Sequence, residues 1–158
     1  MAATQQLREI VLKARPLTPD AFAPYGRVIA EERLPMEQLD GRFTANVAVL
    51  GPVPERMGGI NRHMDHTQLF IPLRGAATLV VVAPRDVTID RFDPDRIEAF
   101  VADGSFAYTF DAGTWHIEPK AIDPANNRVI NVQTDVYRQY TELVRLEDSC
   151  GVRVKLAL

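Results

Sequence analysis

Cysteine is almost absent from this sequence, because Cys150 is the only one among 158 residues. A single thiol excludes an intramolecular disulfide and a metal site built from four cysteines. Long apolar runs are also missing, since no stretch reaches the roughly 18 residues that a membrane helix needs. The first fifteen residues contain no apolar segment of the kind that forms a signal peptide. We therefore expect a cytoplasmic protein with no membrane partner.

Charge of one sign is scarce as well. The chain has 18 Lys and Arg residues against 21 Asp and Glu residues, for a net charge of -3. No basic run and no cluster of basic and aromatic residues interrupts this balance, so nucleic acid is not an expected partner. With 46% hydrophobic and 25% charged residues, the composition is typical of a globular protein. The length predicts a single domain covering residues 1–158, with a substantial core.

Turn-forming residues are plentiful, with 11 prolines and 9 glycines. Their even distribution is typical of short strands joined by turns. The pattern predicts strands over residues 7–17, 43–51, 97–104, 106–119, 128–135 and 140–147. Two further apolar runs, 69–75 and 76–84, meet at Gly75 and predict a hairpin.

One short helix is predicted over residues 18–26. Thr18 can cap it, Pro19 suits its first position and Gly26 can stop it. In the strand over 43–51, alternation places Phe43, Ala45, Val47 and Val49 on one face. Eight or more strands and one clear helix favour an antiparallel sandwich or barrel.

Polar residues cluster in two places along these predicted strands. In the first, Asn61 and His63 are two residues apart and face the same side of a strand, and Gln68 begins the next run. In the second, residues 111–116, Gly113 can make a turn that precedes Trp115 and His116. Those two side chains must point to opposite faces.

The spacing of these residues resembles the two motifs of the cupins. The first motif falls on Asn61, His63, Gln68 and Gly75, and the second on Asp111, Gly113 and His116. The resemblance implies an all-β, cupin-type double-stranded β-helix (a jelly-roll barrel) with the short N-terminal helix in addition. It also implies that Asn61, His63, Gln68 and His116 line one pocket, which in cupins usually holds a divalent metal.

Four blocks of the chain, residues 17–29, 61–75, 79–84 and 113–119, are similar to the ureidoglycolate lyase family. This cupin-fold family acts in allantoin and purine breakdown and splits ureidoglycolate into glyoxylate and urea. Its motifs match Arg62, His63, Gln68, Phe70, Ile71, Pro72, Trp115 and His116. The resemblance implies a carbon–nitrogen lyase of the amidine-lyase type, a small acid as substrate and a homodimer.

The sequence departs from the family pattern near the expected pocket. Ile117 stands where the family has a second histidine, and Glu118 replaces the proline that follows it. Asp111 stands at the position of another histidine of the family. Gln133–Thr134 stand where the family has an Asp-Arg pair. Two alternatives therefore stay open. The protein could act on another small hydroxy or keto acid, or it could bind such an acid or a sugar without turnover.

Cleavage of a carbinolamine such as ureidoglycolate needs a base, an acid and a cation that holds the carboxylate. His116 is the predicted acid–base residue, because imidazole titrates near neutral pH. His63 is its predicted partner or a metal ligand. Arg62 is the carboxylate-binding candidate from the family match, although strand parity places it opposite His63 unless a bulge intervenes. Arg74 is the second candidate for that role.

Four further positions carry two interpretations each. Gln68 can orient substrate or serve as a neutral ligand, and Trp115 can contact substrate or pack in the core. His66, in the turn between motif positions, can be functional or structural, and Glu118 can reach the pocket mouth or lie on an exposed rim.

The predicted metal ligands are His63, His116 and Gln68. Together with Asn61 they form a neutral set of nitrogen and oxygen donors, which suits nickel, zinc or manganese. A pocket without a metal is the alternative, because the carboxylate ligand typical of cupins is replaced by Gln68.

Overall fold

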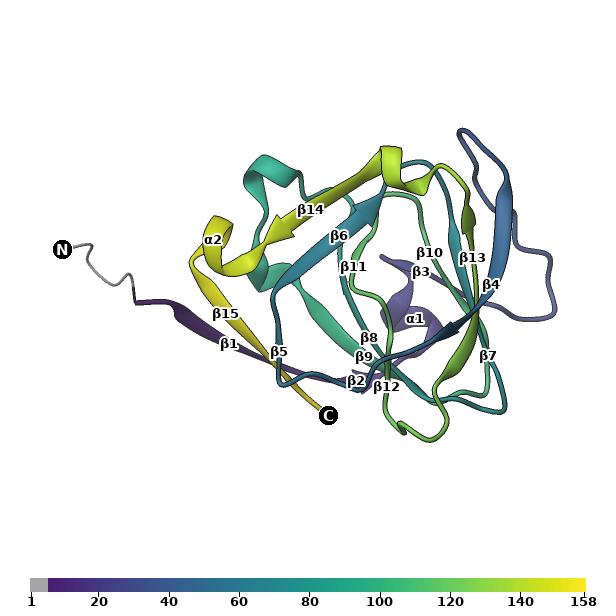
Figure 1. Cartoon of the computed structure of the whole chain (residues 1–158), viewed down its shortest axis with the longest axis horizontal. Coiled ribbons are helices and arrows are strands. Elements are labelled where there is room, and N and C mark those ends of the chain that lie inside the picture. The colour runs from purple at the N-terminus through teal and green to yellow at the C-terminus, as the bar shows by residue number, and fades with distance from the viewer. Residues whose placement is uncertain (1–5) are drawn as a thin grey trace.

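The computed structural model describes residues 6–158, which form two facing β-sheets with a third, smaller sheet beside them (Figure 1). The five-stranded sheet has the order β3 (Gly26–Val28), β10 (Tyr108–Phe110), β7 (Gln68–Pro72), β13 (Arg128–Thr134) and β4 (Phe43–Val49). The seven-stranded sheet has the order β14 (Thr141–Arg145), β6 (Gly59–His63), β11 (Trp115–His116), β8 (Thr78–Ala83), β9 (Glu98–Ala102) and β2 (Arg15–Pro16), and β12 (Lys120–Ala121) pairs with β8. The prediction of an all-β fold with a short N-terminal helix is confirmed.

The third sheet joins segments from opposite ends of the described chain. It consists of β1 (Arg8–Lys13), β15 (Val152–Ala157) and β5 (Arg56–Met57), with β1 parallel to β15 over their full length. The two strands lie side by side in Figure 1. The sequence patterns predicted the first strand but not β15.

Helical segments are short. α1 (Pro19–Phe22) begins as predicted, because the Thr18 hydroxyl accepts a hydrogen bond from the backbone N–H of Ala21 at 3.3 Å. It ends earlier than expected, and Gly26 belongs to β3 instead of stopping the helix. A side chain at Gly26 would place its Cβ 1.7 Å from the carbonyl oxygen of Thr109, so the strand contact requires glycine.

The remaining helical segments were not predicted. They are η1 (Ile89–Arg91), η2 (Pro94–Arg96), η3 (Tyr137–Tyr140) and α2 (Leu146–Cys150). No helix in residues 6–158 has the length and apolar character needed to cross a membrane.

The hairpin predicted about Gly75 is wrong. β7 pairs with β10 and β13, whereas β8 pairs with β9, β11 and β12, so the two strands belong to different sheets. Arg74 and Gly75 both adopt positive φ angles, 52° and 68°, in the connection that crosses between the sheets. Two adjacent apolar runs indicate two strands, but they do not specify the partner of either one.

Two apolar clusters account for the complete burial of β8. Val80 and Val82 pack in a cluster between the two main sheets, and Leu79 and Val81 pack in a second cluster on the opposite face. That second cluster includes Val154 of the small sheet. β8 is therefore covered on both sides, which explains its continuous apolar sequence.

The apolar face predicted for β4 points away from the core. Val47 and Val49 are 53% and 62% exposed, because they lie on the outer side of the five-stranded sheet. Ala48 is on the inner side and packs against the cluster between the sheets.

Candidate active site

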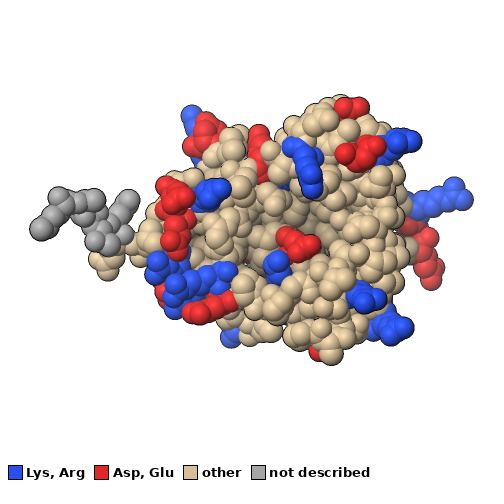
Figure 2. All heavy atoms as spheres, viewed as in Figure 1, with Lys and Arg blue, Asp and Glu red and all other residues tan. Residues whose placement is uncertain are grey.

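A cavity of about 200 Å³ opens between the two main sheets. Its walls are formed by Ala48, Asn61, His63, Gln68, Phe70, His116, Glu118, Asn131, Gln133 and Tyr137. Strand alternation brings them together: β6 and β11 supply the histidines, and β7 and β13 supply amide side chains from the facing sheet. The face seen in Figure 2 is hollowed near its centre, where an acidic and a basic side chain lie next to each other.

His63 and His116 come close together in this cavity. His116 pairs across strands with Asn61, two residues before His63, and the two imidazole centroids are 5.0 Å apart. The predicted convergence of Asn61, His63, Gln68 and His116 is present in the geometry, because all four line the same cavity.

Hydrogen bonds fix the tautomers of both rings. The Nδ1 of His116 lies 2.9 Å from the carbonyl oxygen of Thr114, which can only accept, so this Nδ1 carries the proton. The Nδ1 of His63 lies 2.8 Å from the hydroxyl of Thr141, which already donates to the carbonyl of Tyr137. That hydroxyl oxygen therefore accepts from Nδ1–H of His63. Each ring keeps a lone pair on Nε2.

Burial also determines the charge of the two histidines. It lowers the pKa of His63 to about 4, with a further contribution from the neighbouring His66. It lowers the pKa of His116 to about 3, and the nearby His63 adds to the effect. Both rings are consequently neutral at neutral pH, when their Nε2 lone pairs can accept a proton or bind a cation.

Two amide oxygens complete a set of acceptors. The Gln68 amide donates from Nε2 to Asn131 Oδ1 at 2.9 Å and to Gln133 Oε1 at 3.3 Å, which orients its own oxygen away from these residues. Gln68 Oε1 and Asn61 Oδ1 are buried and have no hydrogen-bond partner. Buried acceptors without donors are costly unless something else satisfies them.

This donor set fits a divalent cation. Two imidazole nitrogens and two amide oxygens match the preferences of nickel, zinc and manganese. Within residues 6–158 no group of three or more His, Cys, Asp or Glu side chains could hold a metal, so the amides of Asn61 and Gln68 would have to contribute.

Arg62 and Trp115 do not line the cavity. The Arg62 guanidinium donates to Glu142 at 2.6 Å and stacks over Trp115 at 4.4 Å. It also donates to the carbonyls of Arg85 and Val87. No bulge reverses the strand parity, so Arg62 lies on the opposite face of β6 from His63 and the structure does not bring it to the cavity. Trp115 is fully buried in the core.

The other predicted positions lie at various distances from the cavity. Arg74 is in the exposed connection between β7 and β8. His66 is fully buried, stacks on His63 with centroids 5.5 Å apart, and is hydrogen-bonded to Asp65 at 2.7 Å. Of the departures from the family pattern, Glu118 and Gln133 line the cavity, whereas Asp111 and Ile117 do not.

Asn131 and Tyr137 line the cavity but were not predicted. Asn131 and Gln133 are two residues apart on β13, so the alternation of polar side chains within 128–135 is a signal that would have found them. Tyr137 lies in η3, for which the sequence offers no comparable signal.

Two facing sheets with these inward polar side chains define a cupin-type protein. The sequence model of the family described as ureidoglycolate lyase matches residues 48–150, and the chain belongs to this family. It is 32% identical to the ureidoglycolate lyase of Burkholderia cepacia over 142 residues, which cover 76% of this chain and 78% of the relative. It is 28% identical to the ureidoglycolate lyase of Azotobacter vinelandii over 127 residues, and the match covers 67% of this chain and 75% of the relative. The ureidoglycolate lyase of Pseudomonas paraeruginosa is 32% identical over 127 residues, and the match covers 66% of this chain and 73% of the relative.

Proposed function

We propose that this protein is a ureidoglycolate lyase, which releases urea and glyoxylate from ureidoglycolate. The observation that carries the proposal is the pair of neutral histidines, His63 and His116, whose Nε2 lone pairs are free in a cavity of about 200 Å³. That volume suits a small acid, and the relatives are named for this reaction.

His116 is the proposed proton carrier. Its Nε2 takes the proton of the substrate hydroxyl while the carbon–oxygen double bond of glyoxylate forms and the C–N bond breaks. The electron pair of that bond leaves with the urea nitrogen, which then receives the proton from the imidazolium. Because burial lowers the pKa of His116, the imidazolium gives the proton up readily.

His63, Gln68 and Asn61 would hold a divalent cation through Nε2 and the two amide oxygens. When bound, such a cation supplies positive charge that stabilises the alcoholate. Thr141 keeps the Nε2 lone pair of His63 available by accepting its Nδ1 proton. Gln133 and Asn131 hold the amide of Gln68 in place.

Urea release from racemic ureidoglycolate tests this function. The purified protein is assayed as isolated, with added nickel, zinc or manganese, and after treatment with a chelator, and spontaneous breakdown is subtracted. His116→Ala and His63→Ala should abolish release, whereas Arg74→Ala, outside the cavity, should not. Turnover that survives both histidine substitutions would contradict the site. Turnover that survives the chelator would show that the two histidines move protons without a metal.

A second candidate is an enzyme or binding protein for another small hydroxy or keto acid. Gln133 supports it, because this departure from the family pattern lies on the cavity wall. The distinguishing result is binding of glyoxylate or oxalate, measured by calorimetry, without any release of urea.

We also propose a homodimer in the cytoplasm. The exposed valines on the outer face of β4, Val47 and Val49, support association with a second copy. Sedimentation equilibrium measures the assembly, and Val47→Lys should shift it towards the monomer. The single-domain organisation of residues 1–158 stays a prediction.

A further inference from the structure

Within residues 6–158, the wall of the cavity lacks a lysine or arginine side chain that could bind the carboxylate of an acid substrate. In the described part of the chain, its lining side chains are apolar, amide, imidazole or phenol groups and one carboxylate, that of Glu118. Arg62, the candidate from the family motif, is engaged on the other side of β6. The described side chains of the cavity wall therefore offer a small hydroxy acid no permanent positive charge.

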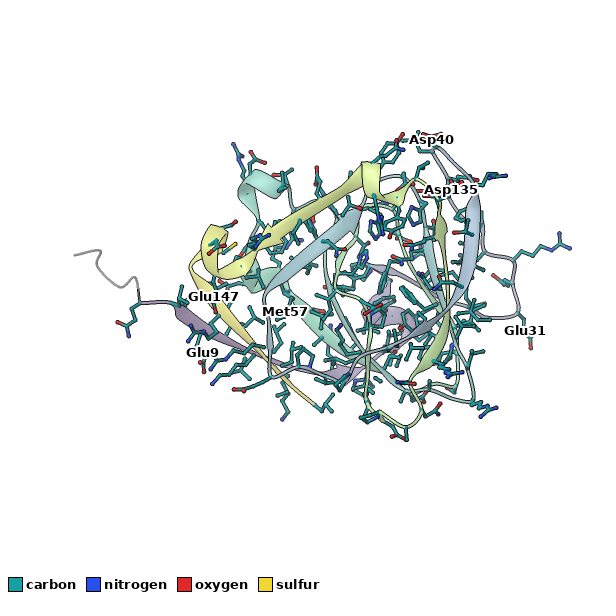
Figure 3. All side chains as sticks on the ribbon, viewed as in Figure 1. Glu9, Glu31, Asp40, Met57, Asp135 and Glu147 are labelled. Atoms are coloured by element: carbon teal, nitrogen blue, oxygen red, sulfur yellow. The ribbon has the colours of Figure 1, made fainter. Side chains whose placement is uncertain are left out.

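A groove adjoins the cavity and shares two residues with it, Asn61 and Glu118. Its other lining residues are Pro54, Arg56, Met57, Gly58, Gly59, Ile117, Lys120 and Leu143, and Figure 3 labels Met57. The two shared residues place the groove directly beside the cavity.

Lys120 lies at the boundary between the two spaces. Its Nζ is 3.5 Å from Oε2 of Glu118, a cavity-lining residue, and its side chain is only 23% exposed. Lys120 sits on β12 opposite Leu79, while Ala121, the next residue, packs between the main sheets. Strand alternation therefore directs Lys120 away from that core, and its contact with the cavity wall is made through Glu118.

The ion pair at this boundary is loose. A separation of 3.5 Å exceeds the 2.7–2.9 Å typical of a charge-assisted hydrogen bond, and the Glu118 side chain is 57% exposed. A partly exposed pair of this kind stabilises the fold little. The ammonium of Lys120 can therefore exchange Glu118 for another carboxylate at small cost.

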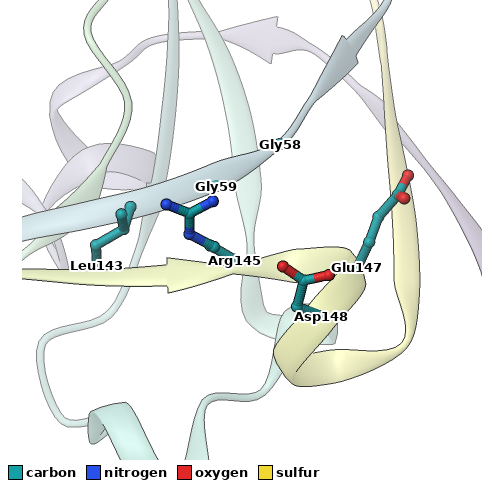
Figure 4. A pocket seen from close by; sticks show the side chains of 6 residues that line it. All are labelled: Gly58, Gly59, Leu143, Arg145, Glu147 and Asp148. Atoms are coloured by element: carbon teal, nitrogen blue, oxygen red, sulfur yellow. The ribbon is translucent and has the colours of Figure 1, made fainter.

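Two other cations border the groove system but are placed less well. Arg56 is 48% exposed and pairs with Glu55. Arg145 lies beside Gly59 in a further groove, seen in Figure 4, whose lining residues include none of those that line the cavity. Lys120 alone of these three forms an ion pair with a residue of the cavity wall.

We infer that Lys120 binds the carboxylate of the substrate, and that Glu118 occupies its ammonium in the free protein and is displaced when the acid enters. The inference rests on the proposed function for the identity of the acid. It makes Lys120 a specificity-determining residue, because it selects a small molecule with an anionic end at the mouth and a reacting carbon near the histidines. Glu118 competes with the carboxylate of the substrate for the ammonium of Lys120.

Substitutions at the two residues should act in opposite directions. Lys120→Met should raise KM for ureidoglycolate about tenfold or more, which corresponds to about 1.4 kcal/mol, with kcat changed less than twofold. Lys120→Arg should restore most of the affinity. Glu118→Gln should lower KM, because the competing carboxylate is gone.

Lys155→Met is the matched control, because Lys155 forms a similar partly buried ion pair, with Glu9 at 3.1 Å, and lines neither the cavity nor the groove. Its KM should equal that of the wild type. Thermal unfolding of each variant checks that the fold is retained, and loss of fold in Lys120→Met shifts the comparison to Lys120→Gln.

Binding of oxalate to the metal-free protein, measured by calorimetry, separates this inference from the proposed function. Oxalate affinity that falls in Lys120→Met supports the inference even if the wild type releases no urea. Unchanged KM and unchanged oxalate affinity in Lys120→Met overturn it, whether or not the wild type is a lyase. A wild-type protein that neither releases urea nor binds oxalate overturns both proposals.

Discussion

The imidazole rings of His63 and His116 meet edge to face, with their centroids 5.0 Å apart and their planes inclined by 63°. The rings come from neighbouring strands, β6 and β11, and each one donates its Nδ1 proton to a group of the scaffold. Their Nε2 atoms are thus prepared as acceptors before any ligand enters. The scaffold partners should matter to activity almost as much as the rings.

Thr141→Val tests that dependence. The substitution removes the oxygen that accepts the Nδ1 proton of His63 but keeps the shape of the side chain. Loss of a partner that orients a functional histidine typically costs about 10–100-fold, so kcat should fall within that range. Thr141→Ser keeps the hydroxyl and should retain wild-type kcat. Equal rates for the two variants in the urea assay would contradict the role of Thr141.

Arg62 should matter to stability and not to substrate binding. Arg62→Met removes a buried guanidinium that pairs with Glu142 at 2.6 Å and stacks on Trp115. Breaking a buried pair from one side costs about 3–5 kcal/mol, and Glu142 is partly exposed, so the free energy of unfolding should fall by about 2–4 kcal/mol. KM should stay unchanged. Urea denaturation and steady-state kinetics measure the two effects, and a large rise in KM would return Arg62 to the site.

Acid should destabilise the metal-free protein through the two cavity histidines. An unfolded histidine has a pKa near 6.5, whereas burial lowers the pKa of folded His63 to about 4 and that of His116 to about 3. The unfolded state binds more protons below pH 6.5, so stability is complete above that pH and is lost as the pH falls towards the folded values. Each histidine contributes a slope of up to about 1.4 kcal/mol per pH unit in that window.

Chemical denaturation at several pH values between 7 and 4 measures this slope. His116→Gln removes one titrating ring and should flatten the curve by about 1 kcal/mol per pH unit. Identical slopes for the variant and the wild type would show that His116 is not buried as a neutral imidazole.

Gln68→Glu should strengthen metal binding. It supplies the carboxylate that a divalent cation prefers, at a position where an amide oxygen is buried without a partner. The amide of Asn131 must turn to donate to the new side chain, so part of the gain is offset. Nickel affinity measured by calorimetry should rise about tenfold or more. Gln68→Leu is the control that should weaken it, and the opposite order would rule out Gln68 as a ligand.

Local patterns predicted much of the fold because each pattern has a local cause. The Thr18 cap, the period-two alternation of β6 and the spacing of Asn61, His63 and Gln68 all depend on neighbouring residues. The convergence of His63 with His116 followed from the motif spacing that resembles the cupins. Strand parity correctly placed Arg62 on the opposite face of β6 from His63. The family motif, taken alone, suggested that Arg62 lies in the cavity.

Partners that are distant in sequence were not predictable in the same way. The separation of β7 from β8 depends on which sheet each strand joins, and β15 depends on a parallel partner more than 100 residues away. Lys120 borders a groove that exists only after β5, β6 and β12 are assembled. Such relationships are set by packing between elements and leave little trace in any one segment.

The parallel pairing of β1 with β15 has a consequence for biosynthesis. β1 is among the first described segments to leave the ribosome, and its partner in the register Arg8↔Val152 is among the last. Ile10 and Leu12 on β1 pack against the same apolar cluster as Val152 and Val154. During translation this cluster lacks one of its covering layers, so its apolar side chains stay open to chaperones and to neighbouring nascent chains until β15 emerges.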